Sequence, residues 1–164
     1  MYKLKRLNRI FINLIIASII PFLIWGPFFP DLIVSVSALS FLYYLLKNNN
    51  FHYFNKKPFI IFLLFCIIIT LISLESEDIP LSIKSSLFYF RIGIFSCFVW
   101  YLIDRDQRIL SYFYYTLILC FVVLIFDGYI QFFTGKNLVG LKIIGTRISS
   151  FFGDELIMGS YLSR

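Results

Sequence analysis

Side chains that are able to bind a phosphate or a carboxylate gather near the end of the chain, around Arg147. This arginine is followed by two carboxylates, Asp154 and Glu155, with only small, aromatic and apolar residues between. A guanidinium group is planar and can hold a phosphate or a carboxylate through two parallel hydrogen bonds. Arg147 is therefore the strongest candidate for an anion-binding residue. A salt bridge from Arg147 to Asp154 or Glu155, which would only fix the loop, is the competing interpretation.

The two carboxylates also bear on where the next helix begins. Asp154 and Glu155 stand directly before an apolar segment, 156–162. Negative charge is favourable in the first turn of a helix because it faces the positive end of the helix dipole. We therefore expect both residues in the first turn of a further membrane helix, of which 156–162 is the start.

A second polar group precedes Arg147, where a long apolar run closes at Asp127. Turn-forming and amide residues then interrupt the apolar pattern, at Gly128, Gln131, Thr134, Gly135 and Asn137. Such residues indicate a structured turn where the chain leaves the membrane. Gln131 follows Asp127 at helical spacing, so the two side chains could hydrogen-bond on a continued helix. Both are expected to support the site around Arg147.

Arg91 is a third candidate because it lies inside an apolar stretch. A helix over 85–103 would place it about two turns below its outer end. A charge at that depth is costly, so the side chain should reach the interface or face a polar cavity. Lys84 would share that face of the helix, with Phe88 between the two cations. The alternative is a structural anchor that pairs with an acidic residue of the preceding segment, Glu75, Glu77 or Asp78.

The elements that must position these residues are membrane helices. Of the 164 residues, 60% are hydrophobic and 15% are charged, which is too apolar for a soluble domain of this size. The apolar residues gather in uncharged runs at 10–30, 32–46, 58–74, 92–103 and 109–126. A hydrocarbon core of about 30 Å needs about 20 helical residues. We therefore predict an all-α, polytopic membrane protein with about five transmembrane helices and the start of a sixth, in one integral-membrane domain over 1–164.

The charged residues between the runs predict the orientation. With the N-terminus in the cytoplasm, nine Lys and Arg residues face the cytoplasm and five face the outer side. The positive-inside rule requires this asymmetry. The expected setting is the inner membrane of a bacterium, with the candidate residues facing the periplasm. Much of the cytoplasmic charge is expected to contact anionic membrane lipids.

Several classes of function are excluded by the composition. Cys66, Cys97 and Cys120 each fall inside an apolar run without paired spacing, so we expect buried thiols rather than disulfides or metal ligands. The net charge of +6 is divided between the two faces of the membrane, which argues against a nucleic-acid partner. His52 lies in a loop and is expected at the interface rather than in catalysis. No nucleotide-binding, zinc-protease or serine-hydrolase motif occurs.

The polar pattern of the last third resembles the O-antigen ligase and polymerase family, whose members are polytopic glycosyltransferases of bacterial surface polysaccharides. The resemblance is carried by Asp127, the stretch 131–135 (Gln-Phe-Phe-Thr-Gly), Asn137, Gly140 and Arg147-x-x-x-Phe151-Phe152-Gly153, before a segment with Gly159. It implies about a dozen helices, a cytoplasmic N-terminus and an active site that faces the periplasm.

The same resemblance implies a reaction. A glycan would pass from an undecaprenyl pyrophosphate donor to a lipid A core or sugar acceptor, without a metal or other cofactor. Cationic side chains would stabilise the departing pyrophosphate, and a histidine of a large periplasmic loop would act as base. Arg147 matches the arginine that precedes the next helix of the family, and Arg91 matches the basic position in its fourth span. Both would then be pyrophosphate ligands.

Two departures from the family pattern limit what is carried over. The family often has glycine at the position of Ser150, and Asn-Pro at the positions of Asp154 and Glu155. A large periplasmic loop and a periplasmic histidine are missing from this sequence. The chain is therefore expected to be the N-terminal part of a longer ligase-like protein and to be inactive by itself. The competing hypotheses are a small accessory or lipid-binding membrane subunit without enzymatic activity, and a fragment of a transporter.

Overall fold

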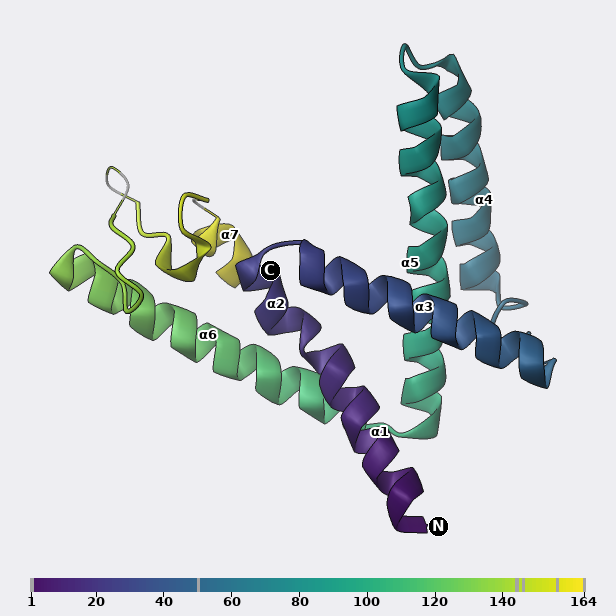
Figure 1. The fold of residues 1–164 in the computed structure, drawn as a ribbon, viewed down its shortest axis with the longest axis horizontal. Coiled ribbons are helices and arrows are strands. Elements are labelled where there is room, and N and C mark those ends of the chain that lie inside the picture. Colours follow the sequence, from purple (N-terminus) through teal and green to yellow (C-terminus); the bar gives the residue numbers. More distant parts are fainter. Residues whose placement is uncertain (1, 50, 144, 146, 156, 164) are drawn as a thin grey trace. The chain divides into compact units, whose positions relative to one another are not determined.

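The structure is a computed structural model that describes residues 2–49, 51–143, 145, 147–155 and 157–163, with side chains from Ile10 onward. The described residues form helices joined by turns and loops, so the all-α prediction is confirmed (Figure 1). The elements are α1 (Tyr2–Ala17), α2 (Ile19–Trp25), α3 (Phe28–Asn48), α4 (Lys57–Ile72), η1 (Ser73–Glu75), α5 (Ile79–Arg105), α6 (Arg108–Thr134), η2 (Ser150–Phe152) and α7 (Met158–Leu162).

Four helical segments in the described part are long and apolar enough to cross a membrane. They are Phe28–Asn48, Lys57–Glu75, Ile79–Arg105 and Arg108–Thr134. Two of the apolar runs, 32–46 and 92–103, are short by themselves, but their helices extend into polar residues. Helix α3 includes Asp31 and Lys47, and α5 carries Arg91 inside it, as predicted. This pattern is that of a multi-pass membrane protein.

The prediction of five long spans is corrected at the first run, 10–30, which the structure divides. Helix α1 ends at Ala17, and α2 starts after Ser18. Pro21 has no N–H to donate to the carbonyl of Ala17, so the helical hydrogen-bond ladder is interrupted there. The Ser18 hydroxyl donates to the carbonyl of Ile15 at 2.6 Å and supports the interruption.

The end of α2 shortens this apolar helix further. Gly26 stops α2 with φ of 131°, a value that favours glycine, and Pro27 follows. The apolar stretch Ile10–Trp25 is about 24 Å long at a rise of 1.5 Å per residue, less than a hydrocarbon core of about 30 Å. The described part therefore has four long apolar helices and one shorter apolar helix. The orientation of the chain stays a prediction.

The chain folds as two compact units, one formed by Met1–Pro30 with Ile109–Arg164 and the other by Asp31–Arg108. In the second unit, α4 and α5 form an antiparallel hairpin through η1 (Figure 1). Gly93 of α5 permits their close approach, because a methyl group there would lie 2.5 Å from the ring carbon Cε1 of Phe62.

Helix α3 packs on α5 within the same unit. The ring centre of Phe41 lies 5.3 Å from that of Phe98 and 5.4 Å from that of Tyr101. Nearer the start of both helices, Asp31 contacts Arg91. Helix α3 therefore crosses α5 and contacts it at these two places (Figure 1).

In the first unit, α7 contacts both α2 and α6. The Tyr161 hydroxyl donates to the carbonyl of Ile20 at 3.1 Å, and its ring centre lies 6.0 Å from that of Phe121. Gly128 of α6 leaves room for Met158, whose Cε would lie 2.7 Å from a methyl group at position 128. The cysteines Cys66, Cys97 and Cys120 are buried and free, as predicted.

Candidate anion-binding site

Two buried polar side chains near the end of α6 hold the loop that contains Arg147. Asp127 and Gln131 have no exposed surface, although most of α6 is apolar. A buried polar group is costly unless it is hydrogen-bonded. Both residues meet this requirement through the segment 138–150.

Asp127 bonds two distant points of the loop. Its Oδ1 accepts a hydrogen bond from the backbone N–H of Leu138 at 2.9 Å, and its Oδ2 accepts one from the Ser150 hydroxyl at 2.5 Å. Hydrogen bonds to a carboxylate are shorter and stronger than those between neutral groups. The carboxylate therefore ties both ends of the loop to α6.

Gln131 binds the backbone of the same loop. Its Oε1 accepts from the backbone N–H groups of Ser149 and Ser150, at 3.1 and 2.8 Å, and its Nε2 donates to the carbonyl of Leu141 at 3.3 Å. The expected hydrogen bond between Gln131 and Asp127 is not among these contacts. Each side chain points its polar atoms toward the loop instead, because the loop backbone would otherwise be buried without partners.

Asn137 completes the network from within the loop. Its Oδ1 accepts from the backbone N–H groups of Val139 and Leu141, at 3.1 and 2.7 Å, and its Nδ2 donates to the carbonyl of Ser150 at 3.0 Å. An asparagine often closes a turn in this way. The sequence indicated Asn137 as a turn-forming amide residue and as part of the family pattern. Its bond to Ser150 was not predicted, because that bond joins residues far apart in the chain.

Ser150 has a backbone conformation that is unusual for a serine. Its φ is 52°, in the left-handed region where glycine is favoured, and its hydroxyl reaches Asp127. A glycine would adopt this backbone conformation without strain. The hydroxyl in turn gives the serine a contact that a glycine lacks.

We expect Ser150→Ala to destabilise the protein by about 2–3 kcal/mol, because it removes a hydrogen bond to a buried carboxylate and keeps the left-handed backbone. Ser150→Gly loses the same bond but relieves about 1 kcal/mol of backbone strain, so it should destabilise less. Unfolding of the two variants and of the wild-type chain in detergent micelles measures both effects. A Ser150→Ala variant as stable as the wild type would contradict this account of the Asp127 contact.

Arg147 lies in this anchored loop, and its side chain is exposed. The ion pairs among the described residues are Arg91 with Asp31 and Arg108 with Asp106, so Arg147 forms no salt bridge with Asp154 or Glu155. The competing interpretation of Arg147 as a loop-fixing salt bridge is therefore wrong for the described residues. Its guanidinium is left available to an external anion.

The two carboxylates are not in the first turn of a helix. Asp154 and Glu155 are exposed, and α7 starts only at Met158. The chain first makes a turn through η2 and Gly153, whose φ is 61°, and the N–H of Glu155 donates to the carbonyl of Phe152 at 3.1 Å. This turn delays the helix, so the predicted helix start is corrected to Met158.

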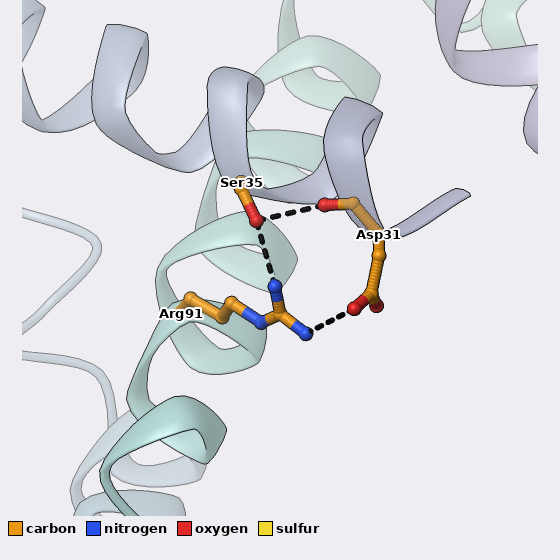
Figure 2. Close-up of polar contacts among 3 residues, drawn as sticks. All are labelled: Asp31, Ser35 and Arg91. Carbon is orange, nitrogen blue, oxygen red and sulfur yellow. Dashed lines mark hydrogen bonds and ion pairs between the residues drawn. The ribbon is translucent and has the colours of Figure 1, made fainter. Parts of the chain in front are cut away.

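Arg91 belongs to the other compact unit and is already paired (Figure 2). Its Nη2 lies 2.7 Å from Oδ2 of Asp31, its Nη1 donates to the Ser35 hydroxyl at 2.7 Å, and its guanidinium carbon lies 4.8 Å from the ring centre of Phe88. The Ser35 hydroxyl donates onward to the carbonyl of Asp31 at 2.7 Å. Arg91 thus joins α5 to α3.

The expected partners of Arg91, namely Glu75, Glu77 and Asp78, are corrected to Asp31. Those acidic residues lie before or at the start of α5, whereas Arg91 is 12 residues after Ile79, about 18 Å along the helix. Asp31 is the one acidic residue among residues 1–46 of the sequence. Its position within the apolar part of the chain could have indicated it as a partner for a buried cation. Lys84, Phe88 and Arg91 line one cavity of about 430 Å³, which confirms that they share a helix face.

Comparisons with family models, with curated proteins and with solved structures found no match. Among the described residues, no three His, Cys, Asp or Glu side chains lie close enough together to hold a metal ion. The structure thus brings Asp127 and Gln131 together with the loop of Arg147. The assignment to the O-antigen ligase and polymerase family rests on the sequence pattern alone and is a proposal.

Proposed function

We propose that the chain acts in a polytopic glycosyltransferase of the O-antigen ligase and polymerase type, at the periplasmic face of a bacterial inner membrane. Arg147 binds the diphosphate of an undecaprenyl pyrophosphate-linked glycan, which is transferred to a lipid A core or sugar acceptor. The observation that carries this proposal is an exposed guanidinium, without a carboxylate partner among the described residues, on a loop anchored by Asp127 and Gln131.

The anchoring supports the proposal because electrostatic catalysis depends on charges that are in place before the reaction. A cation held by a fixed loop stabilises the charge that develops on a departing diphosphate without reorganising first. Gln131 bonds the loop backbone at Leu141, six positions before Arg147, and at Ser149, two positions after it. A guanidinium also matches the geometry of phosphate oxygens through paired donors.

Arg91 is the weaker of the two proposed diphosphate ligands. Asp31 balances its charge at 2.7 Å, and two of its guanidinium nitrogens already donate to protein oxygens. Binding a phosphate there would require the ion pair to open. We therefore assign Arg91 mainly to holding α3 against α5.

A lipid-binding subunit without enzymatic activity is the second candidate function. The cavity of about 430 Å³ beside α3 and α5 favours it, because the lining is mostly apolar and includes Lys84 and Arg91 at its polar part. An acyl or isoprenoid chain with a phosphate group has matching chemistry. This function would use the second unit rather than Arg147.

Ligand competition in lipid nanodiscs distinguishes the two candidates. The chain is loaded with radiolabelled undecaprenyl diphosphate and challenged with unlabelled undecaprenyl diphosphate, undecaprenol or phosphatidylglycerol. The glycosyltransferase proposal predicts displacement by the diphosphate only. Equal displacement by phosphatidylglycerol would favour the lipid-binding subunit, and an absence of saturable binding would contradict both.

A further inference from the structure

The turn that follows α6 carries an arrangement of side chains that the proposed function does not use. Lys136 and Lys142 form an antiparallel bridge, and both are exposed. The flanking hydrogen bonds run from the N–H of Asn137 to the carbonyl of Leu141, at 2.9 Å, and from the N–H of Ile143 to the carbonyl of Gly135, at 3.2 Å. The two lysines are therefore a non-hydrogen-bonded pair, the closer of the two pair types, with side chains on the same face.

Two like charges in such a pair repel each other unless an anion lies between them. The turn does not separate them, because it is fixed from several sides. Asn137 bonds the N–H groups of Val139 and Leu141, Asp127 bonds the N–H of Leu138, and the Thr134 hydroxyl donates to the carbonyl of Lys136 at 2.7 Å. A fixed turn that carries two lysines on one face is suited to a phosphate.

The tip between the two lysines is apolar and exposed. Leu138 and Val139 are 61% and 70% exposed, and Phe133 at the end of α6 is 79% exposed. A turn in water normally carries polar residues at these positions. Aromatic and apolar side chains beside lysines are instead typical of the interface between hydrocarbon and headgroups.

The length of α6 also places this turn at the interface between the hydrocarbon core and the headgroups. The helix has 27 residues and is therefore about 40 Å long, about 10 Å more than the hydrocarbon core. If Arg108 marks the inner boundary, Phe133 and the turn lie just beyond the outer boundary, within the headgroup layer. We infer that the turn 136–142 is a membrane-contact surface, in which Leu138 and Val139 enter the bilayer interface and Lys136 and Lys142 bind phospholipid phosphates.

Spin labels on the full chain in nanodiscs test the depth of the tip. A label at Val139→Cys is compared with one at Asp154→Cys, an exposed polar position between η2 and α7. The unmodified chain measures how far the buried native cysteines are labelled. At position 139, oxygen should broaden the signal more than a water-soluble nickel chelate does, and the reverse should hold at 154. Equal access of the chelate to both positions would overturn the inference.

The lipid phosphate contact is tested by changing the charge and the lipid. Adding phosphatidylglycerol to phosphatidylcholine nanodiscs should lower chelate access at position 139. The double variant K136Q/K142Q should lose this response, while K136R/K142R should keep it. Dipolar broadening between labels on two copies would instead assign the tip to a second copy of the chain. A response to undecaprenyl diphosphate alone would assign the lysine pair to the glycan donor, and either result would overturn the inference.

Discussion

Replacing Gln131 by leucine should release the loop 138–150 from α6. The leucine has a similar size, but it leaves the N–H groups of Ser149 and Ser150 without their partner. The carbonyl of Leu141 loses one hydrogen bond and keeps the one from the N–H of Asn137. Each buried backbone group that loses its hydrogen bond costs about 1–3 kcal/mol. We therefore expect the loop to lose about 3 kcal/mol or more, with amide exchange at Ser149 and Ser150 faster by at least about 100-fold.

Hydrogen exchange with residue resolution measures this loss, and Gln107→Leu is the matched control. Gln107 is exposed directly before the start of α6, far from the loop along the helix, and the same substitution there should leave exchange in the loop unchanged. Unchanged protection of Ser149 and Ser150 in Gln131→Leu would contradict the role of the glutamine as an anchor. General unfolding is recognised separately, because it would also raise exchange inside α4.

The long helices were predictable because hydropathy reports transfer from water to lipid, which depends on local composition. The prediction of one long helix over 10–30 was wrong for a reason that composition alone does not show. Its mean hydropathy is that of a span, yet Pro21 removes a helical donor and Gly26 takes a left-handed φ. Both residues lie inside the run in the sequence, and their positions argue against one continuous helix.

The polar residues of the site were predictable by type, and their partners were not. Asp127 and Gln131 stand out because they interrupt an apolar helix. Their partners are mainly backbone N–H groups of the loop, which every residue except proline carries, so no residue type marks them. The pairing of Arg91 with Asp31 is hidden in the same way, because it depends on how α3 crosses α5.

The anchoring of the loop also determines what a substitution of Arg147 can affect. Asp127 and Gln131 make the hydrogen bonds that hold the loop to α6. Their partners in the loop are groups of Leu138, Ser149 and Ser150, and not of Arg147. The side chain of Arg147 is exposed and forms none of the described ion pairs. Removing the guanidinium should therefore leave the loop folded, so that activity and stability can be separated.

Under the proposed function, Arg147→Ala is expected to lower glycan transfer in membrane vesicles by at least about 100-fold. The reason is the loss of a cation that stabilises the departing diphosphate. Arg147→Lys keeps the charge but not the paired donors, so its transfer rate should lie between those of the alanine variant and the wild type. The measured quantity is the initial rate of transfer from a radiolabelled undecaprenyl pyrophosphate-linked glycan.

Arg108→Ala is the matched control, because Arg108 is also exposed but lies at the other end of α6. It should transfer glycan at nearly the wild-type rate. In Arg147→Ala, hydrogen exchange at Ser149 and Ser150 should remain slow, which shows that the loop is intact. A wild-type transfer rate in Arg147→Ala would contradict the proposal that Arg147 binds the diphosphate. A structural salt bridge would not explain the arginine either, because Arg147 has no carboxylate partner among the described residues.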